Sequence, residues 1–153
     1  MIGRNLAVTL TAVVVVGVVT TLFFLSGAAT GSLFGKVTVP ALGTVRAVGV
    51  GVYWDSGCSN IVTSVDWGVI EPGLTKNVGV YIKNEGTDAM TLSLDTENWA
   101  PSAASSYMSL TWDYGGQVIV ADGVVQVTLS LAVSDTIEGI TSFSFDIVIS
   151  GSG

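Results

Sequence analysis

The chain has 153 residues, a length that suits one folded domain, with no histidine, a single cysteine and a formal net charge of −7. All twelve acidic residues lie within residues 55–153, where only two lysines accompany them and the formal charge is −10. Such a surface repels phosphate backbones, so we expect no nucleic-acid partner. The missing histidines exclude Ser/His/Asp and Cys/His catalytic sites and the usual zinc ligand sets within this chain, so we do not expect an enzyme.

An uncharged apolar run, residues 6–25, comes after a short basic stretch that contains Arg4. As a helix this run is long enough to cross a bilayer core, and the positive charge before it favours export of the C-terminal part of the chain. Three fates stay open: a secretory signal peptide cut near Gly27, Ala28 and Ala29, a retained membrane anchor, or a helix packed with its copies in a filament core, as in type IV pilins. All three predict an extracellular or cell-surface domain, with the membrane as a partner during export or as an anchor.

A short segment with strand alternation comes next, and it belongs to an N-terminal arm and linker that we assign to residues 30–44. Pro40 lacks an amide hydrogen and is expected to end the pairing of this strand. Two interpretations stay open: an ordinary first strand or linker, or a donor strand that completes the sheet of another copy through backbone hydrogen bonds. Repeated head to tail, donation gives a homopolymer. The candidate donor strand consists of Leu33, Phe34, Lys36, Val37, Thr38 and Val39.

Residues 45–153 alternate with period two in seven or eight segments, separated by Pro-Gly, Glu-Gly, Gly-Gly and Asp-Gly turn signals. This count and spacing predict an all-β fold: an immunoglobulin-like antiparallel β-sandwich behind the hydrophobic helix of residues 1–29. The predicted inward residues are Val48, Val50, Val52 and Trp54; Val78, Val80 and Ile82; Met90, Leu92 and Leu94; Met108, Leu110 and Trp112; Val125, Val127, Leu129, Leu131 and Val133; and Phe143, Phe145, Ile147 and Ile149.

Serine and threonine dominate the outward positions of the later strands, at Thr128, Ser130, Ser142 and Ser144. Two interpretations are open, because such residues are chosen for β-propensity on a solvent face and also leave a strand edge with few charges to guard it. Among the four tryptophans, Trp54 and Trp112 share faces with core aliphatics and are predicted to be buried. Trp67 and Trp99 are expected to pack against turns at strand ends.

Carboxylates at Asp55, Asp66, Glu71, Asp95, Glu97 and Asp113 supply hard oxygen ligands, but none has the spacing of an EF-hand loop. We therefore weigh a Ca²⁺ site against plain surface carboxylates and assign no catalytic, cofactor-binding or metal-ligating residue. Cys58 cannot form a disulfide within the chain, and is either a small buried hydrophobe or a cross-link between subunits.

The sequence also resembles a known group of proteins. The "DWG" and "EPG" turn at residues 66–73, "VYIKNEG" at residues 80–86 with "MTLSL" after it, and the closing "GITSFSFDIVI" are similar to small secreted immunoglobulin-like proteins of archaea. These are the archaeal bundling pilus subunits and the TasA/camelysin-like matrix-fibre subunits. The resemblance implies an exported β-sandwich that donates its N-terminal strand to a neighbouring copy. The peptidase label of the camelysin side is not carried over, because no zinc-binding motif is present.

These features predict a structural subunit of an extracellular filament, a pilus or a matrix fibre, that polymerises with copies of itself by strand donation and needs no cofactor. Two alternatives stay open. One is a type IV pilin-like subunit that assembles through a retained hydrophobic helix, and the other is a membrane-anchored binding module on the cell surface.

Overall fold

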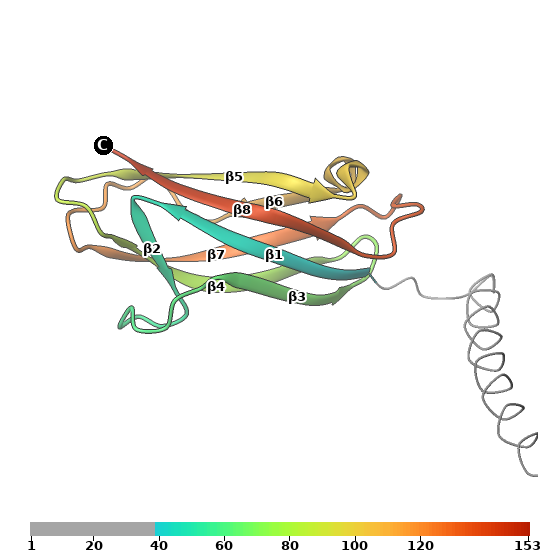
Figure 1. Cartoon of the computed structure of the whole chain (residues 1–153), viewed down its shortest axis with the longest axis horizontal. Coiled ribbons are helices and arrows are strands. Elements are labelled where there is room, and N and C mark those ends of the chain that lie inside the picture. Colours follow the sequence, from blue (N-terminus) through green and yellow to red (C-terminus); the bar gives the residue numbers. More distant parts are fainter. Residues whose placement is uncertain (1–38) are drawn as a thin grey trace, which may run out of the picture. The chain divides into compact units, whose positions relative to one another are not determined.

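The computed structural model describes residues 39–153, which form eight β-strands and one short 3-10 helix (Figure 1). The strands stack as two four-stranded sheets, with the orders β3-β1-β8-β5 and β2-β4-β7-β6. All neighbouring strands are antiparallel except β1 and β8, which run parallel. The predicted all-β sandwich is confirmed. Its elements are β1 (Val39–Val48), β2 (Val50–Tyr53), β3 (Ser64–Ile70), β4 (Thr75–Asn84), β5 (Thr91–Ala100), η1 (Ser102–Ser106), β6 (Met108–Trp112), β7 (Val124–Val133) and β8 (Phe143–Ser152).

The two sheets enclose one apolar core, to which the alternating residues of β7 and β8 contribute most. Full burial of one such aliphatic or aromatic side chain stabilises the fold by about 1.5–3 kcal/mol. The predicted inward residues that are buried are Val50, Val52, Val80, Ile82, Met108, Val127, Leu129, Leu131, Val133, Phe143, Phe145, Ile147 and Ile149. Those that are partly buried against this core are Val78, Met90, Leu92, Leu94, Leu110, Trp112 and Val125.

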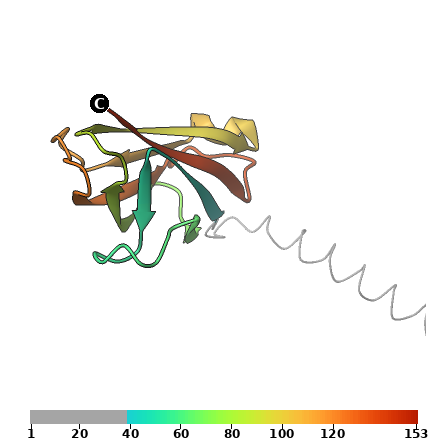
Figure 2. The ribbon, with the colours of Figure 1, turned by 60° about the vertical axis from the view of Figure 1, so that its left-hand side comes forward.

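The chain crosses from one sheet to the other at Gly49, and two burial predictions near this corner, for Val48 and Trp54, are wrong. Gly49 adopts a φ of +74°, which suits glycine, and it separates β1 from β2. The alternation therefore does not continue through it, and Val48 is 55% exposed. Trp54 lies beyond the end of β2, in the projecting loop before β3 (Figures 1 and 2), and is 39% exposed.

Trp67 takes a more central place than expected, while Trp99 lies at the end of a strand, as predicted. Trp67 lies within β3 and is 2% exposed, so it belongs to the core and does not merely cover a turn. The alternation that would have revealed it is broken one residue later, where Gly68 adopts a φ of +63°. Trp99 lies in β5 and stacks on Phe145, with ring centroids 4.2 Å apart.

β1 begins at Val39, so residues 39–44, which the sequence pattern assigns to the arm and linker, are part of the sandwich. Pro40 does not end the pairing of this strand and lies opposite Val69 of β3. Its missing amide hydrogen is tolerated because β8 pairs with β1 only from Ala41 onward, so at Pro40 the strand has one neighbour.

One polar side chain in the described part of the chain is fully buried. Asn84, at the end of β4, donates from Nδ2 to the carbonyl oxygens of Asp88 and Ile119, at 2.8 and 2.9 Å. Its Oδ1 accepts a hydrogen bond from the backbone N–H of Gly86 at 2.8 Å. With its polar atoms paired, Asn84 anchors the loop between β4 and β5 to the segment before β7.

Candidate functional site

Most of the residues predicted for strand donation fall outside the described part of the chain. These are Leu33, Phe34, Lys36, Val37 and Thr38 of the candidate donor strand, together with Gly27, Ala28 and Ala29 of the candidate cleavage region. Val39 is the exception: it is the first residue of β1, and its backbone lies opposite Ile70 of β3.

The described residues do show the other half of the expected site, which is the place in a sheet that a donated strand could fill. β1 lies in the middle of its sheet, antiparallel to β3 on one side and parallel to β8 on the other (Figure 1). We call this position between β3 and β8 the β1 slot. Because β3 and β8 are joined only through β1, removing this strand would open the sheet through its centre rather than shorten it at an edge.

The strand in the β1 slot presents small side chains to the core. Its inward positions are Ala41, Gly43, Val45 and Ala47, which pair with the buried residues Phe143, Phe145, Ile147 and Ile149 of β8. β1 is therefore held mainly by backbone pairing along both of its edges, while β8 supplies the large side chains. A strand of this kind is recognised by main-chain hydrogen bonds and by a narrow steric profile.

Of the inward positions of β1, Gly43 leaves the least space for a side chain. A Cβ atom at this position would lie 2.8 Å from Cδ1 of Ile147 and 3.1 Å from Nε1 of Trp67. The Trp67 N–H is itself buried and has no hydrogen-bond partner among the described residues. The indole ring thus packs closely against β1, and a larger residue at position 43 requires the end of the Ile147 side chain to shift.

A shallow hollow of about 480 Å³ lies where β1 enters the sheet. It is bordered by Ala41 and Leu42 of β1, Val69 of β3 and Phe143 of β8, and its lining is mostly apolar. Leu42 and Val69 are 46% and 48% exposed. The hollow is open to solvent, whereas Ala41 itself is 3% exposed.

The outer face of the same sheet is acidic beside the slot. Glu97 of β5 and Asp146 of β8 lie directly opposite each other. Arg46 of β1 donates to Glu97 at 2.9 Å, and Nδ2 of Asn98 donates to Asp146 at 2.8 Å. Thr44 of β1 is the neighbour of Asp146 on the other side. Exposed ion pairs of this kind add little stability.

The serines and threonines considered above as an unguarded edge do not form one. Thr128, Ser130 and Ser144 are half-buried on the central strands β7 and β8, whose backbone groups already pair with neighbours on both sides. The edges of the first sheet are β3 and β5. β5 carries Asp95 and Glu97, and the β1–β3 ladder has a register shift, both of which discourage edge pairing. The β1 slot is therefore the better candidate for exchange.

The loop between β2 and β3 is organised by a carboxylate. Asp55 accepts hydrogen bonds from the hydroxyl of Ser59 at 2.8 Å and from the backbone N–H groups of Ser59 and Asn60. The Ser59 hydroxyl, together with the Asn60 N–H, lowers the pKa of Asp55. Cys58 is a free thiol in this loop, partly exposed and outside the core. These contacts describe a structured turn.

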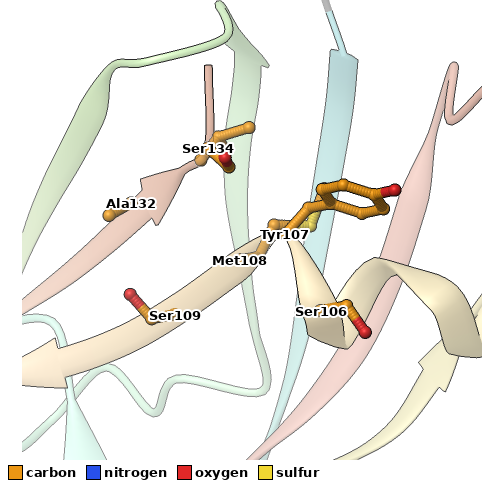
Figure 3. A pocket seen from close by; sticks show the side chains of 7 residues that line it. Ser106, Tyr107, Met108, Ser109, Ala132 and Ser134 are labelled. Atoms are coloured by element: carbon orange, nitrogen blue, oxygen red, sulfur yellow. The ribbon is translucent and has the colours of Figure 1, made fainter. Parts of the chain in front are cut away.

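A second hollow, of about 310 Å³, lies where the end of β7 meets the start of β6 (Figure 3). Tyr107, Met108 and Ser109 border it on one side, and Ala132 and Ser134 on the other. Its polar groups are hydroxyls and backbone atoms, without a carboxylate or amine beside them. The arrangement offers no acid–base pair for catalysis.

Within residues 39–153 no three metal-ligating side chains come together as a group that could hold an ion. The same residues contain no helix that is long and apolar enough to span a membrane. No protein-family model matches this chain, and no curated protein matches it. What can be said of its function therefore comes from its own sequence and structure.

Proposed function

We propose that this chain is an exported structural subunit whose immunoglobulin-like sandwich joins further copies in an extracellular filament, a pilus or a matrix fibre, by strand donation. The observation that carries the proposal is the β1 slot. An N-terminal strand fills the centre of a sheet through backbone pairing on both edges, and it adds no large side chain to the core.

Such a strand is suited to exchange because another segment of similar profile makes the same backbone bonds. An empty slot would expose Trp67, Phe145 and Ile147, which are at most 2% exposed when β1 is present. The cost of exposing these side chains means that the slot stays filled, either by the chain's own β1 or by a strand from another copy. Exchange of this strand between copies then gives a head-to-tail polymer, and the copies need no contacts other than those of the strand in the slot.

The remaining parts of the proposal come from the sequence. The uncharged residues 6–25 serve export, the candidate donor strand lies directly before β1, and the partner is a second copy of the chain. The subunit carries out no catalysis and takes no cofactor. The sandwich is of the size of an immunoglobulin-like domain, about 100 residues.

Deleting residues 30–38 tests the proposal, because the deletion removes most of the candidate donor strand and leaves β1 whole. The expected result is a folded monomer, by circular dichroism and gel filtration, that forms no filaments in electron micrographs. The matched control replaces the same residues with a Gly/Ser linker of equal length, and it should behave like the deletion. Normal filaments from both variants would refute strand donation.

The intact mass of the native protein separates the proposal from its alternatives. Cleavage near Gly27, Ala28 and Ala29 leaves a free arm. Both the pilin-like subunit and the membrane-anchored binding module require residues 6–25 to remain. A mass that includes the apolar run, in protein taken from filaments, would favour assembly through that run.

A further inference from the structure

We propose that the β1 slot takes residues 33–39 of a second copy in one defined register, with Gly35 in the place of Gly43. The inference rests on the proposed function and deepens it, because it names the groove, the segment and the alignment. Four independent features of the described residues and the sequence support it.

The first feature is a repeat in the sequence. The segment "LFGKVTV" at residues 33–39 aligns without gaps with "ALGTVRA" at residues 41–47. Glycine and valine coincide at the third and fifth positions, and apolar residues coincide at the first, second and seventh. The arm therefore carries the same alternation as the strand that now occupies the slot.

The second feature is the steric demand of the slot. Position 43 favours glycine, because a Cβ atom there would lie 2.8 Å from Cδ1 of Ile147 and 3.1 Å from Nε1 of the buried Trp67. Contacts below 3.0 Å force the neighbouring atoms to move. Gly35 meets this demand in the proposed register, whereas a shift by two residues would bring Leu33 or Val37 to the tight point.

The third feature is size. In the proposed register Leu33 and Val39 take the places of Ala41 and Ala47, so the arm carries larger apolar side chains than β1 at both ends of the slot. The shallow hollow of about 480 Å³ that borders Ala41, Leu42 and Phe143 lies at the first of these ends. Larger apolar side chains remove more surface from water when the strand enters the sheet.

The fourth feature is charge. In the proposed register Lys36 takes the place of Thr44, whose neighbour on β8 is Asp146, and Asp146 lies opposite Glu97. A lysine beside two carboxylates on the outer face of a sheet is a favourable cross-strand arrangement. Lys36 thus restores a positive charge next to Glu97 when Arg46 leaves the slot with β1.

The chain is long enough to make the exchange. When β1 leaves the slot, residues 40–49 become a connector between the donated strand and β2. Ten extended residues span up to roughly 33–36 Å. Gly49, at a φ of +74°, already marks the corner at which β1 separates from β2. Each copy can then keep β2 in place while its arm enters the next copy.

Disulfide trapping between two full-length variants tests the register. Both carry Cys58→Ser; one adds Thr38→Cys and the other Val148→Cys. Thr38 takes the place of Arg46, whose β8 neighbour is Val148, so the two sulfurs meet within disulfide range. The expected result under assembly conditions is a cross-linked dimer that contains one of each variant.

The register control replaces Val148→Cys with Ser144→Cys. Ser144 is the neighbour of Leu42, four residues away along β8 or about 13 Å, which is beyond disulfide reach. We expect at least tenfold less cross-linked dimer from this pair. Equal yields from the two pairs, or no dimer from the first, would overturn the register. A third variant carries both Thr38→Cys and Val148→Cys in one chain. A disulfide within that chain would mean that its own arm fills the slot, and it would overturn the proposal that a second copy does.

A steric variant separates failure of this inference from failure of the proposed function. Gly35→Val should reduce the Thr38–Val148 cross-link at least tenfold and abolish filaments, while Gly31→Val, before the segment that enters the slot, should leave both nearly unchanged. If deletion of residues 30–38 abolishes filaments but Gly35→Val does not, strand donation stands and this slot and register are wrong. If the deletion leaves filaments intact, the proposed function itself fails.

Discussion

β1 and β8 are neighbours in one sheet, and they differ in the size of the side chains that they place in the core. β8 places four large side chains in the core, from Phe143 to Ile149, and these are at most 4% exposed. β1 offers the same neighbours two alanines, a glycine and a valine. A strand can therefore be essential to the hydrogen bonding of a sheet and yet be replaceable in its core.

The largest effect should come from β8. Phe145→Ala removes a ring that is 2% exposed and stacks on Trp99, with centroids 4.2 Å apart. We expect a loss of about 3–5 kcal/mol in the free energy of unfolding, from lost burial and the cavity left behind. Urea unfolding monitored by tryptophan fluorescence measures it. A loss below about 1 kcal/mol would show that β8 does not dominate the core.

The next largest effect should come from adding atoms to β1. Gly43→Val forces side-chain atoms against Ile147 and Trp67 and should cost about 1–3 kcal/mol. Gly79→Val is the matched control, because a Cβ atom there meets only Nε2 of Gln126, at 3.9 Å. The same unfolding experiment compares the two variants. Equal stability of both would mean that the slot is wider than the structure indicates.

A smaller effect should come from removing atoms from β1. Val45→Ala deletes two methyl groups from a half-buried side chain opposite Ile147, and should cost about 1 kcal/mol. Ile147→Ala, its direct neighbour, should cost about 2–5 kcal/mol. Chemical denaturation of the two variants side by side measures the contrast between the strands directly. Similar losses would mean that the two strands contribute equally to the core.

The smallest effect should be that of acid on two loops. The backbone N–H of Thr128 donates to Asp113 at 2.7 Å and lowers the pKa of that carboxyl, as the Ser59 hydroxyl does for Asp55. A lowered folded-state pKa gives stability that is present above the unfolded pKa and is lost as the pH falls through the folded value.

The measurement compares the protein with the double variant Asp55→Asn and Asp113→Asn in urea at pH 7 and near pH 3. The stability advantage of the protein over the variant should shrink on acidification, since the carboxylates of the unfolded chain, with pKa values near about 4, bind protons before those of the folded protein do. An advantage that grows would contradict the lowered pKa values. The contrast between β1 and β8 should remain at both pH values.

The sequence predicts the strands that alternate without interruption and misses what depends on distant neighbours. β7 and β8 could be predicted residue by residue, because each inward position is a large aliphatic or aromatic one. The corner at Gly49 exposes Val48, and β2 ends one residue before Trp54, so the pattern wrongly predicts both inside. The irregular backbone at Gly68 breaks the alternation of β3, which is why the pattern predicts Trp67 at a strand end. The candidate site was harder still. That β1 runs parallel to β8 and favours glycine at position 43 depends on segments about 100 residues apart in the chain, which no local pattern reports.

Strand donation is tested most sharply by the identity of the strand between β3 and β8 in an assembled filament. A cryo-electron microscopy reconstruction at side-chain resolution would show it. We predict residues 33–39 of the adjacent copy there, with Gly35 against Trp67 and residues 40–49 as the connector between copies. A filament in which every copy keeps its own β1 in the slot would contradict strand donation.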